Sequence, residues 1–171
     1  LHAPAQVIMA ARTQTPCLVL FRQPRDSILS HVIRFPHISV GQCMKDYLRF
    51  YEAVRPYRES YLLARFESVT RDFGAVTMAL NNKFGSSFAE FEHTPENETK
   101  CFEIVQRRYE ARLGGGKPIS EAIHSRPSEK KAALRDQNKQ TFRREFESAR
   151  LRSLREKIER LYQVLEAEAD I

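Results

Sequence analysis

The order of apolar segments between residues 17 and 85 constrains the fold of this chain most. Residues 17–21, CLVLF, form a continuous apolar run, which predicts a strand covered on both faces. Residues 26–35 and 41–55 carry apolar side chains at steps of three and four, which predicts two helices. A second strand is expected at 61–66 and a third helix at 72–85. This order is typical of an α/β fold, a parallel sheet with flanking helices.

Single residues mark the ends of these segments. Asp26 is expected to cap the first helix and Pro36 to end it, while Pro56 should stop the second. Asp72 should begin the third helix, and Gly85 should close it. Two strands make a poor sheet, and the chain opens with LHAPAQVIMA, which contains no initiating Met at position 1. We therefore expect an N-terminally incomplete α/β domain.

The composition changes after residue 128. From residue 129 to 169 the chain is rich in Arg, Lys, Glu, Leu and Ala and contains neither Pro nor Gly. Apolar residues recur at alternating steps of three and four: Leu151, Leu154, Ile158, Leu161 and Leu165. This pattern predicts a long C-terminal amphipathic helix over 129–171, appended to an α/β domain at 1–128. The stripe could pack on the domain or a neighbouring chain, form a coiled-coil dimer, or present a basic face to nucleic acid, in that order of preference.

The net charge of +6 and the pI near 9.4 favour an anionic partner, which could be nucleic acid, a nucleotide or an acidic glycan. No apolar run reaches the roughly 18 residues of a membrane span. The three cysteines are an odd number without metal-ligand spacing, so we expect reduced thiols and a cytoplasmic protein.

Positive charge lies where the first predicted strand ends. Arg22 follows the strand directly, and Ser30 comes eight residues later, about two turns into the next helix. In parallel α/β sheets, ligands bind beyond the carboxyl ends of the strands. An arginine grips phosphate with two parallel hydrogen bonds, and a serine hydroxyl adds one more. The pair predicts a phosphate site, although Arg22 could instead form a surface ion pair and Ser30 could lie on a bare helix surface.

The segment RQPRDSILS resembles the R-x-P-x-D-x-x-x-S motif of the PAPS-dependent sulfotransferases, which have a P-loop fold. In that family the first Arg and the last Ser hold the 3′-phosphate of 3′-phosphoadenosine-5′-phosphosulfate (PAPS), and these positions match Arg22 and Ser30. LLARFESV at 62–69 and TRDFGAVTMALNNKFG at 70–85 resemble the next strand and helix of the family. The resemblance implies nucleotide binding and transferase activity.

Two further positions follow from the same resemblance. HSRPSEKKAALR at 124–135 is similar to a late family loop that returns a cation to the cofactor phosphate, which implies that Arg126 is a cofactor contact. LHAP matches the H-x-P segment that carries a catalytic base, which implies that His2 accepts the proton of the acceptor hydroxyl. The family's phosphosulfate-binding loop would precede His2, and Phe66 and Ser68 stand where many members have Tyr and Asp.

The resemblance implies a sulfotransferase that moves a sulfuryl group from PAPS to a hydroxyl or amine of an acceptor, a small molecule or a glycan. No metal, nucleic acid or membrane span is expected. The alternative is a non-catalytic relative that serves as an interaction subunit, with a protein partner or a second copy bound through the C-terminal helix. A P-loop kinase relative is a lesser alternative. The acceptor and the oligomeric state stay open.

Overall fold

The computed structural model describes residues 3–35, 37–112 and 140–171. Most of these residues are helical, and the strands among them are β1 (Leu18–Phe21) and β2 (Leu62–Arg65). The two strands pair in parallel, with Leu18 opposite Leu62 and Phe21 opposite Arg65. The coarse expectation is therefore confirmed, since the fold combines helices with a parallel sheet.

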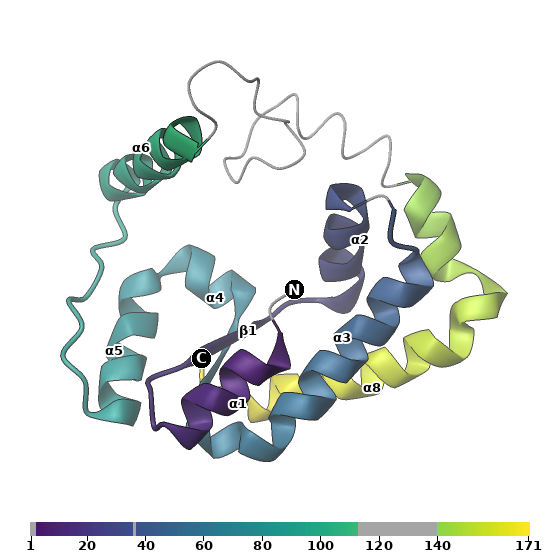
Figure 1. Cartoon of the computed structure of the whole chain (residues 1–171), viewed down its shortest axis with the longest axis horizontal. Helices are drawn as coiled ribbons and strands as arrows, with labels where there is room; N and C mark the ends of the chain where they lie inside the picture. The colour runs from purple at the N-terminus through teal and green to yellow at the C-terminus, as the bar shows by residue number, and fades with distance from the viewer. Residues whose placement is uncertain (1–2, 36, 113–139) are drawn as a thin grey trace.

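Two helices connect the strands. α2 (Pro24–Arg34) and α3 (Val40–Val54) lie between them, and a 3₁₀ helix, η1 (Arg55–Ser60), leads into β2. The Ser39 hydroxyl caps α3 by accepting a hydrogen bond from the Gln42 amide at 3.2 Å. The buried residues of α3 fall on one face at helical spacing: Val40, Cys43, Met44, Tyr47, Leu48, Tyr51 and Val54. α3 is consequently the central helix of the core (Figure 1).

The start of α2 differs from the expectation. Gln23 occupies the cap position, and its side-chain oxygen accepts a hydrogen bond from the Asp26 amide at 3.2 Å. Asp26 itself lies in the first turn of α2, where its carboxylate faces the positive end of the helix dipole. The prediction that Asp26 caps α2 was wrong because Pro24 already fits the first helical position, which places the cap at Gln23, three residues before Asp26.

Beyond β2 come α4 (Phe66–Arg71), α5 (Phe73–Phe84) and α6 (Pro95–Arg112). The Asp72 carboxylate caps α5 by accepting a hydrogen bond from the Ala75 amide at 3.0 Å, and Gly85 ends the helix in the left-handed region at φ 61°. Both expectations for this helix are confirmed. Neither α4 nor α1 (Pro4–Arg12), which packs near α3, was expected. In Figure 1, α6 stands apart from the other helices.

The C-terminal segment is a broken helix. Residues 140–147 are helical, Ser148 follows, and η2 (Ala149–Leu151) leads into α8 (Arg152–Glu168). The Arg155 guanidinium donates to the carbonyls of Phe146 and Ser148 and fixes this break. The expectation of one continuous helix was wrong for the described part, while residues 113–139, with the expected boundary at 128, lie outside the described residues. The stripe residues Ile158, Leu161 and Leu165 are buried in the chain's own core, and α8 packs against α3.

The last residues of the chain fasten β2 on the side away from β1. The Asp170 amide donates to the Leu63 carbonyl at 2.9 Å, and the Asp170 carboxylate accepts from the Leu63 amide at 2.7 Å. The same carboxylate lies 2.9 Å from Arg58 and 3.5 Å from Lys83. The Arg65 amide donates to the carbonyl of Ile171 at 2.9 Å. We call these contacts of Asp170 and Ile171 the C-terminal clasp.

Candidate anion-binding cavity

A cavity of about 520 Å³ opens where β1 ends and α2 begins. Strand β1, helices α2 and α3, and the first residue of α4 contribute its walls. The lining is mostly apolar and aromatic, with a few polar and cationic groups. This combination is typical of small-molecule sites, where apolar walls hold a ligand and a few polar groups orient it.

Helix α2 has two faces of different character. Ile28, Leu29 and Val32 are buried in the core. The opposite face lines the cavity with Ser27, Ser30, His31 and Arg34, which occur at positions i, i+3, i+4 and i+7. Residues at this spacing share one side of a helix, so α2 presents a polar, cationic stripe to the cavity.

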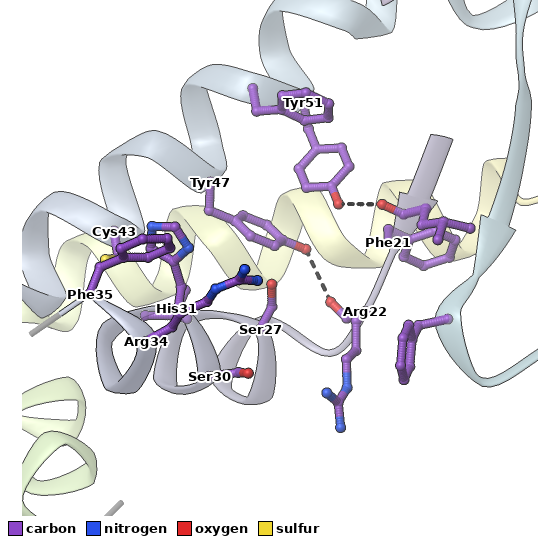
Figure 2. Close-up of a pocket in the computed structure, with 14 residues that line it drawn as sticks. Phe21, Arg22, Ser27, Ser30, His31, Arg34, Phe35, Cys43, Tyr47 and Tyr51 are labelled. Atoms are coloured by element: carbon purple, nitrogen blue, oxygen red, sulfur yellow. Dashed lines mark hydrogen bonds between the residues drawn. The ribbon is translucent and has the colours of Figure 1, made fainter. Parts of the chain in front are cut away.

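Two tyrosines of α3 hold the end of β1 in place. The Tyr51 hydroxyl donates to the Leu20 carbonyl at 2.8 Å, and the Tyr47 hydroxyl donates to the Arg22 carbonyl at 3.3 Å (Figure 2). Burial raises the pKa of both tyrosines above the ordinary value, so the hydroxyls keep their protons at neutral pH. The two hydrogen bonds fix the backbone from which the Arg22 side chain projects.

The Arg22 guanidinium lies against the Phe66 ring, with its central carbon 4.8 Å from the ring centroid. Glu67 and Asp26 approach it to 3.8 and 4.0 Å, which is longer than a hydrogen bond. Its Nε atom is buried and has no hydrogen-bond partner among the described residues. Arg22 is therefore oriented by the ring and partly balanced in charge, but it keeps donor capacity for a further ligand.

The structure places Arg22 and Ser30, the two predicted phosphate-binding residues, in the lining of the same cavity. Ser30 is exposed, and the Arg22 side chain is 38% exposed, so both are accessible to a ligand. His2 and Arg126, the two other predicted site residues, lie outside the described residues. Phe66, at the end of the second predicted strand, is 36% exposed and lines the cavity.

Sequence reasoning missed several residues of the cavity. The predicted phosphate site does not include Ser27, His31 or Arg34, although the spacing from Ser27 to Arg34 matches one face of the predicted helix. Tyr47 and Tyr51 were assigned only to the apolar stripe of α3. The polar stripe was readable from the sequence, whereas the role of the tyrosine hydroxyls depends on tertiary packing.

A second cavity of similar volume, about 520 Å³, adjoins the first. The two share His31, Phe35 and Phe50, and the second also reaches Asp46 and Arg49. The Arg49 guanidinium donates to the Asp46 carboxylate at 3.2 Å, so these charges largely satisfy each other. Within residues 3–35, 37–112 and 140–171, no cluster of side chains suited to a metal ion occurs.

Fold and cavity define a mainly helical protein with a small parallel sheet and a cationic, aromatic-lined cavity at the carboxyl end of β1. No helix in the described part of the chain has both the length and the apolarity to cross a membrane. No family model matches the chain, and comparisons with curated proteins and with solved structures give no match.

Proposed function

We propose that this chain belongs to a sulfotransferase, in which Arg22 and Ser30 bind the 3′-phosphate of PAPS. The observation that carries the proposal is that these two residues, eight positions apart, line one cavity at the carboxyl end of a parallel strand. The resemblance of RQPRDSILS to the phosphate-binding motif of the sulfotransferases supplies the ligand. The cavity contributes the chemistry of an anion site with aromatic walls, and the identity of the anion comes from the resemblance.

The contacts of Arg22 are suited to a phosphate. A guanidinium offers paired N–H groups to a tetrahedral oxyanion, and the terminal nitrogens of Arg22 make no hydrogen bond within the described part of the chain. A phosphate would provide an acceptor at a distance the carboxylates of Asp26 and Glu67 do not reach. The Ser30 hydroxyl would donate one more bond, and the Tyr47 bond to the Arg22 carbonyl would hold the strand end still.

The proposed reaction is the displacement of a sulfuryl group by an acceptor oxygen or nitrogen. For a hydroxyl acceptor, an O–S bond forms, the bond from sulfur to the 5′-phosphate oxygen breaks, and the acceptor proton passes to a base. PAPS supplies the sulfuryl group, and adenosine 3′,5′-bisphosphate leaves. His2 is the proposed base and Arg126 a proposed auxiliary phosphate contact. Removing a general base typically lowers turnover about a hundredfold or more.

Calorimetric titration with adenosine 3′,5′-bisphosphate tests the proposal. The protein used should carry any residues that its gene encodes before Leu1. Arg22→Gln keeps much of the packing on Phe66 but loses the charge, and it should weaken binding by about 1.5–3 kcal/mol, the scale of a hydrogen bond to a charged group. Ser30→Ala changes an exposed hydroxyl and should weaken binding by about 1 kcal/mol. Arg152→Gln, an exposed charge on α8, is the matched control.

The second candidate is a non-catalytic interaction subunit that keeps the fold. The observation in its favour is that Asp26 and Glu67 already lie within 4.0 Å of Arg22 and lower the positive potential there. The same titration separates the candidates. Binding that Arg22→Gln weakens supports the transferase, whereas absence of binding in the unmodified protein supports the interaction subunit.

A further inference from the structure

A second arginine lines the cavity at the other end of α2. Arg34 is the last residue of this helix, and its guanidinium lies over the Phe35 ring, with its central carbon 5.5 Å from the ring centroid. Among the described residues, no carboxylate lies within 4 Å of the Arg34 guanidinium. Its charge is thus less compensated than that of Arg22, which faces Asp26 and Glu67.

Arg34 shares its side of the helix with Ser27. Seven residues separate them, which is close to two helical turns, so both lie on the polar stripe of α2. In Figure 2 the Arg34 side chain extends back over α2 toward Ser27, on the side of the helix that faces Tyr47. No hydrogen bond occupies the Ser27 hydroxyl among the described residues. Arg34 and Ser27 therefore repeat the chemistry of Arg22 and Ser30, one arginine with one serine hydroxyl.

Neighbouring groups leave Arg34 as the source of charge at this end of the cavity. Burial lowers the pKa of His31 below its ordinary value, and the nearby Arg34 charge lowers it further, while Asp46 opposes the shift. His31 is therefore mostly neutral at neutral pH. The remaining lining here, Phe35, Cys43 and Phe50, is apolar.

We propose that Arg34 and Ser27 form a second anion subsite in the cavity, which takes a phosphate or sulfate group of a ligand whose first anionic group binds Arg22 and Ser30. This inference rests on the proposed function for the first group only. At about 1.5 Å of rise per residue, Ser27 and Ser30 lie roughly 4.5 Å apart along the helix axis, and the Arg34 guanidinium extends back toward Ser27 (Figure 2). The cavity then selects compact ligands with two tetrahedral oxyanions over ligands with one.

The second anion could come from the nucleotide's own 5′-phosphate or from a sulfated or phosphorylated acceptor. Calorimetric titration with adenosine 3′,5′-bisphosphate and with adenosine 3′-monophosphate separates these sources. If the 5′-phosphate binds Arg34, the bisphosphate binds roughly tenfold to a hundredfold more tightly, and Arg34→Gln abolishes that difference without changing affinity for the monophosphate. If the acceptor supplies the anion, Arg34→Gln leaves the ratio unchanged and instead weakens binding of glucose 6-sulfate to the protein saturated with monophosphate.

Two further variants are made in parallel. Arg152→Gln removes an exposed charge on α8 and is the control, and Ser27→Ala tests the subsite with a minimal change. The inference is overturned if Arg34→Gln alters neither the nucleotide ratio nor the binding of glucose 6-sulfate. If the unmodified protein binds neither nucleotide, the proposed function fails. The second subsite is then tested separately by titrating the protein with inorganic phosphate. A saturable NMR shift of the Arg34 Nε–H in the Arg22→Gln variant supports the subsite, and the lack of such a shift refutes it.

Discussion

Replacing Asp170 should destabilise the protein through the C-terminal clasp. Its carboxylate accepts the Leu63 amide at 2.7 Å and lies 2.9 Å from Arg58 and 3.5 Å from Lys83. A hydrogen bond to a charged group contributes about 1.5–3 kcal/mol. The ion pairs are 16–27% exposed in their side chains and add at most about 1 kcal/mol, given screening. Asp170→Ala should therefore lower the free energy of unfolding by about 1.5–4 kcal/mol.

Asp170→Asn separates the charge from the hydrogen bond. Its amide oxygen can still accept the Leu63 amide, so we expect a loss of only about 1 kcal/mol, from the ion pairs. Urea denaturation followed by circular dichroism measures both variants, with Glu52→Gln, an exposed carboxylate on α3, as the control. A free energy of unfolding for Asp170→Ala within about 0.5 kcal/mol of the unmodified protein, the range of ordinary surface substitutions, would refute the clasp.

The clasp also predicts a pH dependence. Burial opposes ionisation of Asp170, but hydrogen bonds from Arg58 and the Leu63 amide, together with the charges of Arg58 and Lys83, hold its pKa below the ordinary value. A carboxyl with a depressed folded-state pKa stabilises the fold above its unfolded pKa, near 3.9, and this stability is lost as pH falls through the folded pKa. The difference between the unmodified protein and Asp170→Asn should accordingly shrink below about pH 4. A difference that stays constant from pH 7 to pH 3 would contradict the assignment.

Three further substitutions probe the packing around the site. Tyr51→Phe removes the hydroxyl that donates to the Leu20 carbonyl and should lower the free energy of unfolding by about 1 kcal/mol; an unchanged thermal midpoint would show that the bond adds nothing. Gly74→Ala would place a Cβ against the Phe91 carbonyl oxygen, so we expect urea denaturation to show a free energy of unfolding lowered by about 1–3 kcal/mol. An unchanged free energy of unfolding would mean that the segment after α5 moves to make room for the Cβ. Ile158→Ala should cost about 2–5 kcal/mol because this α8 side chain is buried, and a loss below 1 kcal/mol would argue that α8 does not belong to the core.

The sequence predicted the elements whose signals are local. Both strands, α2, α3 and α5 were expected close to their observed bounds, because period, caps and glycine stops lie within each segment. α4 was missed because Phe66 extends the apolar run of β2, and a short apolar run does not distinguish a strand from a helix. The break before α8 carries neither Pro nor Gly, and it depends on Arg155 reaching carbonyls seven and nine residues away.

The residues of the cavity also fall into those that local sequence patterns predict and those that depend on tertiary structure. The spacing of Arg22 and Ser30, and equally that of Ser27 and Arg34, belongs to one strand–helix segment and can be recognised without the fold. The aromatic wall cannot be recognised in this way. Phe66 follows β2, which pairs with β1 although two helices lie between the two strands in the sequence. The clasp is more distant still, since it joins residue 170 to residue 63. Sequence patterns within one element therefore predict the polar groups of this cavity, while its walls and its rigidity come from tertiary structure.

Arg22 is fixed in place although its buried Nε has no hydrogen-bond partner among the described residues. A buried donor without a partner typically costs about 1–3 kcal/mol, more when it is charged. Nearby carboxylates could relieve this cost, yet Glu67 approaches Nε only to 3.8 Å, although its side chain is 60% exposed. Meanwhile Tyr47 fixes the backbone of Arg22, and Phe66 supports its guanidinium. The terminal nitrogens of Arg22, on a side chain that is 38% exposed, can then bind an anion without the side chain first having to be ordered.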